Sequence, residues 1–126
     1  MDTQFSESIA VALNARSKAY APYSKFAVGA AVKCRSGAVF AGTSVENRSF
    51  GLTICAERVA IGATVVGGEG DFVAIAVTAD SDEPIAPCGP CRQFLAKFAP
   101  DLIIVSATVR GQRKVENLSH LLPDPT

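Results

Sequence analysis

Three of the four cysteines lie in two short motifs that must meet in space if they serve one site. Cys55-Ala-Glu57 comes first, and Pro87-Cys88-Gly-Pro-Cys91 follows. Each motif stands where a helix is expected to begin, and the free N–H groups of a helix N-terminus favour thiolate, the form that binds zinc. Two cysteines separated by two residues can hold one ion, and a third from another helix leaves one tetrahedral position open. Because an open position is typical of catalytic zinc, we expect two helix N-termini to converge, with Cys55, Cys88 and Cys91 as ligands.

The charged residues beside these cysteines suggest two roles, proton transfer and compensation of the thiolate charge. Glu57 follows Cys55 by two residues, close enough to move protons beside a metal without binding it. Three thiolates weaken zinc as a Lewis acid, so a positive group is needed to offset their charge. We expect Arg58 to donate to a ligand sulfur. Arg92 either does the same or lies on the surface.

Two other uses of the cysteines are open on the residues alone. Cys88-Gly-Pro-Cys91 is also the tetrapeptide of thioredoxin-like disulfide oxidoreductases, but the chain has no Trp, and residues 92–126 are too few for the rest of that fold. A closed structural zinc module including His120 would leave Glu57 without a role. Cys34, on an apolar strand, is most simply a core residue.

Length and charge narrow the class of protein. The 126 residues fit a single domain, 1–126. Lys+Arg and Asp+Glu both number 12, so there is no electrostatic reason to bind nucleic acid or an anionic membrane surface. The N-terminus is polar, and no apolar run approaches the roughly 20 residues of a membrane span. We therefore expect a cytoplasmic protein with thiols rather than disulfides.

The hydrophobic pattern predicts alternating helices and strands, hence the α/β class. The expected helices run from Phe5 to about Tyr20, from 53–55 to Gly67, from Pro90 to before Pro100, and over 115–122. The expected strands cover 26–34, 38–45, 72–78, 102–106 and 109–116, with a hairpin turn at Ser36-Gly37. In strand 26–34 small residues (Ala27, Gly29 and Ala31) occupy alternate positions, so one face is trimmed for close packing.

Across nearly its whole length the chain resembles the small homotetrameric zinc-dependent cytidine deaminases. Beyond the spacing of the two cysteine motifs, the resemblance rests on these segments: Ala21-Pro-Tyr-Ser-Lys-Phe-Ala-Val-Gly-Ala-Ala-Val32, Val45-Glu-Asn47, Gly51-Leu-Thr-Ile-Cys-Ala-Glu-Arg58, Pro87-Cys-Gly-Pro-Cys-Arg-Gln93 and Leu121-Leu-Pro123. The order and the spacing of these segments agree with that family.

The resemblance implies a mixed five-stranded sheet flanked by helices, one Zn²⁺ per chain, and a homotetramer with shared active sites. It implies hydrolysis of cytidine or 2′-deoxycytidine to uridine or 2′-deoxyuridine with release of ammonia. Glu57 would take a proton from the zinc-bound water, protonate N3 of the pyrimidine and pass a proton to the leaving ammonia. By the same resemblance Phe26 packs on the ring, the backbone of Ala56 contacts the pyrimidine, and Glu46 binds the ribose.

Departures from the family pattern gather around the substrate. Ser44 replaces an Asn expected to reach the sugar, Phe50 replaces a Tyr, and Ala86 replaces a Ser or Thr; the residues after Leu-Leu-Pro123 include no aromatic. Because hydrogen-bonding positions discriminate strongly between substrates, a second hypothesis stays open. It is a deaminase of a modified cytosine nucleoside, of the blasticidin S type, or of another aminated heterocycle. Without the resemblance, Phe26 would be read as a core aromatic and Glu46 as an exposed carboxylate at a strand end.

Overall fold

The computed structural model describes residues 5–49, 52–87 and 89–121. Three predictions, on Phe50, Cys88 and the segment 124–126, fall outside the described residues. In chain order the elements are α1 (Ser6–Arg16), β1 (Val28–Cys34), β2 (Val39–Thr43), α2 (Ala56–Val66), β3 (Phe72–Ala79), α3 (Gly89–Phe98), β4 (Ile103–Thr108), β5 (Arg113–Asn117) and α4 (Leu118–Leu121). The predicted α/β class is confirmed.

The strands of the described residues form one mixed sheet of five, in the order β2-β1-β3-β4-β5. β1 runs antiparallel to both β2 and β3, β4 runs antiparallel to β5, and β3 and β4 are parallel. A parallel pair needs a crossover connection, and α3 supplies it. The N-terminus of α3, which carries the second cysteine motif, therefore follows the carboxyl end of β3, the edge at which open α/β sheets bind ligands.

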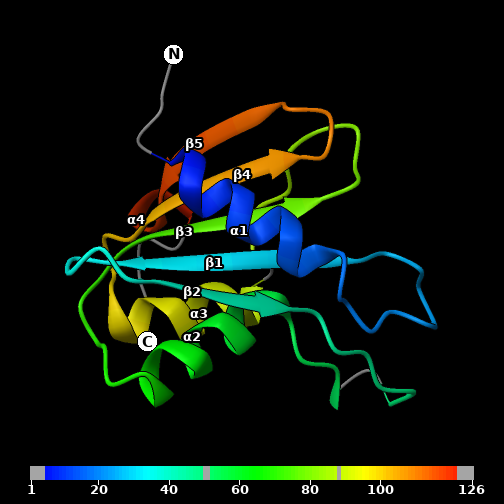
Figure 1. The fold of residues 1–126 in the computed structure, drawn as a ribbon, viewed down its shortest axis with the longest axis horizontal. Coiled ribbons are helices and arrows are strands. Elements are labelled where there is room, and N and C mark those ends of the chain that lie inside the picture. The colour runs from blue at the N-terminus through cyan, green and yellow to red at the C-terminus, as the bar shows by residue number, and fades with distance from the viewer. Residues whose placement is uncertain (1–4, 50–51, 88, 122–126) are drawn as a thin grey trace.

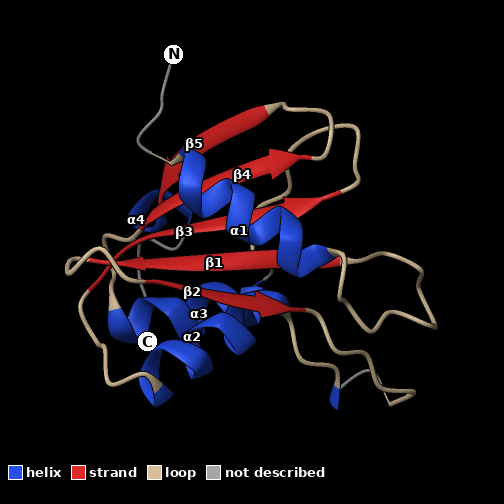
Figure 2. Cartoon of the chain, in the orientation of Figure 1, coloured by secondary structure: helices blue, strands red, loops and turns tan. Residues whose placement is uncertain are grey.

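Helices cover both faces of the sheet (Figures 1 and 2). α1 crosses one face, where its N-cap residue Phe5 and its Ile9 and Ala12 pack on β1, β3 and β4. α2 and α3 lie on the other face. The larger core is there, and contains Ile61, Ile75, Leu95, Ile104 and Leu118. In the described part of the chain no helix is both long and apolar enough to cross a membrane.

Glycines let two helices lie almost against the backbone of the sheet. A Cβ on Gly29 of β1 would lie 2.0 Å from the carbonyl oxygen of Ala12 in α1. A Cβ on Gly42 of β2 would lie 2.3 Å from the backbone nitrogen of Ala60 in α2. The trimmed face predicted for β1 is thus occupied by a helix of the same chain. The absence of a side chain at Gly42 also determines how closely α2 lies against the sheet, and with it the site at the N-terminus of α2.

Some predicted boundaries were wrong by a few residues. α1 ends at Arg16, because the backbone N–H groups of Ser17 and Lys18 bond back to Asn14 and Ala15 and the hydroxyl of Ser17 also bonds to Asn14. Tyr20, expected on that helix, instead pairs with Val45 in an isolated bridge. β1 begins at Val28, so Phe26 precedes the ladder. β5 begins at Arg113, after a turn in which Gly111 has a φ of 95°.

Gly29→Ala should lower the free energy of unfolding by about 1–3 kcal/mol, because the added methyl group forces α1 away from β1. The matched control is Gly62→Ala on α2, where a Cβ meets nothing within 4 Å. That change should be neutral or stabilising by about 0.5–1 kcal/mol. Urea unfolding of both variants at one protein concentration measures the difference. Equal stabilities would show that the close packing of α1 is not needed.

Candidate active site

Two helix N-termini bring the described cysteines of the motifs into one region. Cys55 is the N-cap residue of α2, with extended backbone angles (φ −71°, ψ 150°). Cys91 lies in the first turn of α3 and is fully buried. α2 and α3 contact each other on the same face of the sheet. Both thiols therefore lie at helix N-termini, as the sequence predicts.

Arg58 provides a positive charge at these sulfurs. Its Nη2 donates to Sγ of Cys55 at 3.6 Å and to the carbonyl oxygen of Thr53 at 3.2 Å. The hydrogen bond to Cys55 is the main reason that the pKa of Arg58 is raised, and the charge of Cys91 adds to it. The Nε of Arg58 is buried without a hydrogen-bond partner among the described residues. Arg58 thus lies where the sequence prediction put it.

Glu57 lies in the first turn of α2 with only 5% of its surface exposed. Burial raises the pKa of its carboxyl group. Its own backbone N–H, the positive charge of Arg58 and a hydrogen bond with Cys91 act in the opposite direction. A buried carboxylic group held beside two thiols has few structural uses, and is placed as a proton-transfer group should be.

The donor set fits zinc. Two thiols, a guanidinium bonded to one of them and a nearby carboxylate that the ligand set does not need form a soft, charge-balanced environment. Within the described residues there is no group of three His, Cys, Asp or Glu side chains that could hold a metal. The predicted set includes Cys88, which lies outside them. Cys55, Cys88 and Cys91 are the residues that would hold the ion.

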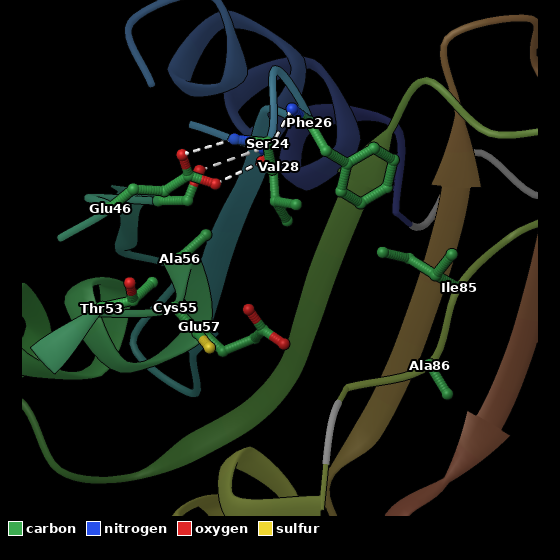
Figure 3. A pocket seen from close by; sticks show the side chains of 11 residues that line it. Ser24, Phe26, Val28, Glu46, Thr53, Cys55, Ala56, Glu57, Ile85 and Ala86 are labelled. Atoms are coloured by element: carbon green, nitrogen blue, oxygen red, sulfur yellow. Dashed lines mark hydrogen bonds between the residues drawn. The ribbon is translucent and has the colours of Figure 1, made fainter. Parts of the chain in front are cut away.

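A cavity of about 310 Å³ opens beside Cys55 and Glu57 (Figure 3). Its lining combines an apolar side with a polar end. The full lining is Ser24, Phe26, Val28, Ser44, Glu46, Thr53, Cys55, Ala56, Glu57, Ile85 and Ala86. In Figure 3 the ring of Phe26 lies on the same side as Ile85 and Ala86, across from Glu46, Thr53 and Ala56. All four residues predicted to bind substrate (Phe26, Ser44, Glu46 and Ala56) line this cavity.

Two polar groups of the lining, the hydroxyl of Ser44 and the carboxylate of Glu46, are held by backbone groups. Ser44 is buried, and its Oγ accepts a hydrogen bond from the backbone N–H of Val28 at 3.2 Å. Oε1 of Glu46 accepts from the backbone N–H groups of Tyr23 at 3.0 Å and Ser24 at 3.1 Å. The hydroxyl of Ser24 donates to Oε2 of Glu46. This bond is the first cause of the lowered pKa of Glu46, so the carboxylate is ionised at neutral pH.

Sequence reasoning missed four lining residues: Ser24, Val28, Thr53 and Ile85. The serine was part of the quoted segment 21–32, so a polar residue two places before Phe26 was the available signal. Arg92 is partly buried; within the described residues it bonds to backbone carbonyl oxygens, and the bond to Cys88 considered for it falls outside those residues. Its Nε donates to the carbonyl oxygen of Pro87 at 2.7 Å and its Nη1 to that of Leu121 at 3.3 Å. Cys34 is a buried thiol whose pKa is raised mainly by burial, in keeping with a core residue.

Comparison with known proteins assigns this arrangement to a family. Residues 2–107 match the family model described as the cytidine and deoxycytidylate deaminase zinc-binding region. The chain belongs to this family. The match spans both cysteine motifs, so the tetrapeptide 88–91 is part of a zinc-binding region. As a member of the cytidine deaminase family, the protein is a hydrolytic deaminase whose cofactor is Zn²⁺.

Individual relatives agree with this assignment. A cytidine deaminase from Halalkalibacterium halodurans is 45% identical over 113 residues, which cover 89% of this chain and 86% of the relative. A blasticidin-S deaminase from Bacillus cereus is 31% identical over 107 residues, covering 79% and 76%. The crystal structure of a cytidine deaminase from Burkholderia pseudomallei superposes with a TM-score of 0.93 at 44% identity and 100% coverage of both chains.

Arg58→Ala should weaken zinc binding by about 10–100-fold, because it removes a donor and a positive charge from the ligand sulfurs. Competition with a chromophoric chelator measures the affinity. Arg35→Ala is the matched control, because Arg35 forms an exposed ion pair with Asp71 and takes no part in the cavity. Equal zinc affinities of the two variants would contradict the role given to Arg58.

Proposed function

We propose that the protein converts cytidine and 2′-deoxycytidine to the corresponding uridines, releasing ammonia. The observation that carries the proposal is a single cavity lined both by Glu57 and Cys55 and by the hydrogen-bonding side chains of Ser44 and Glu46. A volume of about 310 Å³ is within the range of small-molecule sites. A reactive end and a hydrogen-bonding end within one such cavity suit a nucleoside, with its base toward Glu57 and its sugar toward Glu46.

The apolar lining would hold the flat base. Phe26, Val28 and Ile85 would offer the surfaces against which a pyrimidine packs, and the backbone of Ala56, which also lines the cavity, would hydrogen-bond to its edge. When bound, zinc supplies a Lewis acid that makes water nucleophilic at neutral pH. Bond formation and cleavage at C4 are accompanied by proton transfers, and Glu57 would carry these.

Glu57 takes a proton from the attacking water and gives it to ring N3 as the oxygen bonds to C4. Protonation of N3 makes C4 more electrophilic, so the two events support each other. The carboxylate then takes the proton of the new hydroxyl group and delivers it to the exocyclic amino group. The C4–N4 bond breaks, ammonia leaves, and C4 keeps the carbonyl oxygen of uridine. Burial excludes the bulk water that would otherwise compete for these protons.

Ser44 and Glu46 would define the sugar end. The Oγ of Ser44 accepts from Val28, so its own proton is available to donate to a sugar hydroxyl. Serine is shorter than asparagine, and this leaves more room at that end. The 31% identity to a blasticidin-S deaminase makes a modified cytosine nucleoside the second candidate substrate.

Ultraviolet absorbance of the zinc-loaded protein should show turnover of cytidine and 2′-deoxycytidine and little or none of free cytosine. Glu57→Gln should retain zinc and lose at least about 100-fold in kcat, because the amide cannot shuttle protons. Turnover of blasticidin S but not of cytidine would support the second candidate substrate, a modified cytosine nucleoside, over the first. An active Glu57→Gln variant would overturn the proton-transfer assignment.

We also propose that the protein is a homotetramer with shared active sites, in the cytoplasm. An apolar surface patch supports the assembly: Tyr20, Val45, Leu52 and Ile54 are 39–66% exposed, and backbone bridges join Tyr20 to Val45 and Val45 to Ile54. Val45 directly precedes Glu46, so the patch reaches the edge of the cavity. Zinc-binding thiols need a reducing compartment, which supports the location.

Light scattering after size-exclusion chromatography should give about four times the 13.1 kDa of one chain. Tyr20→Glu should yield smaller species, because it places a charge in the apolar patch. An exclusively monomeric wild-type protein that still turns over cytidine would show that each site is complete in one chain.

A further inference from the structure

We propose that Ser24 is a positioning residue that couples Glu46 to Phe26, so that the sugar end and the base-packing side of the cavity are set together. The inference deepens the proposed nucleoside specificity and rests on it. It concerns a residue that the sequence motifs did not single out.

The hydroxyl group of Ser24 both donates and accepts a hydrogen bond. Its hydroxyl donates to Oε2 of Glu46, and its Oγ accepts the backbone N–H of Phe26 at 3.0 Å. One oxygen atom therefore joins the carboxylate and the backbone of the aromatic residue (Figure 3). Tyr23 and Ser24 add two backbone N–H bonds to the same carboxylate. Glu46 thus organises the segment 23–26, with Ser24 as the link to Phe26.

The backbone between Ser24 and Phe26 needs this support. Lys25 has a φ of 62°, and it is the one non-glycine residue with positive φ among those described. This left-handed conformation is disfavoured for lysine and persists where neighbouring bonds impose it. Besides the bonds of Ser24, the N–H of Lys25 bonds to the carbonyl oxygen of Ala21 at 3.1 Å. The direction in which Phe26 leaves the turn follows from this conformation.

The reactive groups belong to a different segment from this turn. Glu57 and Cys55 lie at the start of α2, where Arg58 bonds to Cys55 and Cys91 bonds to Glu57. Loss of the Ser24 hydroxyl should therefore weaken binding of the nucleoside and leave proton transfer by Glu57 unchanged. The expected signature is a raised KM with a nearly unchanged kcat.

Ser36 provides a matched control. Its hydroxyl donates to Oε1 of Glu69 at 3.0 Å and accepts the N–H of Ala38 at 3.4 Å, the same pair of bonds made by Ser24, in the hairpin between β1 and β2. Ser36 does not line the cavity. Ser24→Ala and Ser36→Ala remove equivalent bonds from two exposed turns, and differ in whether Phe26 and Glu46 are joined by them.

For Ser24→Ala we expect the KM for cytidine to rise about tenfold or more, the loss expected for a hydrogen bond to a charged group. The kcat should stay within about threefold. The Kd of uridine, measured by calorimetry on the zinc-loaded protein, should rise in parallel. Ser24→Thr keeps the hydroxyl and should recover most of the loss. Ser36→Ala should match wild type in all these quantities.

A second pair of variants tests the turn without touching Ser24. Lys25→Gly adopts positive φ without strain and should keep KM near the wild-type value, whereas Lys25→Val disfavours that conformation and should raise KM as Ser24→Ala does.

The inference is overturned if Ser24→Ala matches Ser36→Ala in KM and in uridine Kd, or if it lowers kcat with KM unchanged. Uridine binding also separates this inference from the proposed function. A wild-type protein that binds uridine but does not hydrolyse cytidine would contradict the proposed reaction, and the Kd ratios would still decide the role of Ser24. Failure of the wild type to bind either nucleoside would overturn both.

Discussion

Two helices that begin side by side on one face of the sheet create the chemistry of this protein. The N-terminus of α2 presents Cys55 and Glu57, and the first turn of α3 presents Cys91. Thiolates gathered in this way repel one another, and the guanidinium of Arg58 offsets that repulsion from within the same helix. The position of α2 depends in turn on Gly42, whose missing side chain lets the helix lie against β2. Backbone packing and local electrostatics therefore support the same pair of helix ends.

The cavity is built from segments that tolerate change to different degrees. Its reactive end lies on helices with buried neighbours, so substitution there alters both zinc chemistry and packing. Its polar end is held by hydrogen bonds between two segments outside the sheet, around Ser24 and around Glu46. The departures from the family pattern at Ser44 and Ala86 fall on the lining rather than on the reactive groups. A change of lining residue in this chain can therefore alter the molecule that the cavity accepts while leaving the reactive groups in place.

Sequence patterns predicted the features of the fold that depend on residues close together in the chain. The class, the five strands of the described sheet and the start of α2 followed from periodicity, glycine and proline positions. The end of α1 was missed because an apolar Tyr20 continued the helical spacing, although it pairs with Val45 instead. Such a bridge depends on residues far apart in the sequence, which periodicity cannot reveal.

The same distinction holds for the site: motifs of neighbouring residues were predictable, and contacts between residues far apart in the sequence were not. Cysteine spacing and the position of Glu57 predicted the reactive end, whereas the roles of Phe26 and Glu46 came only from the family resemblance. Ser24 escaped notice because its importance lies in bonds to residue 46 and to the backbone of residue 26. A left-handed lysine carries no sequence signal, since glycine is the residue expected at positive φ.

Arg92 links the segment just before the second cysteine motif to the last helix, α4. Its guanidinium joins the carbonyl oxygen of Pro87, just before the second cysteine motif, to that of Leu121 at the end of α4. α4 is itself fixed by the buried Leu118, whose N–H bonds to Leu102. A displacement of α4 would therefore be passed through Arg92 to the segment that leads into the second cysteine motif, although neither α4 nor Arg92 lines the cavity.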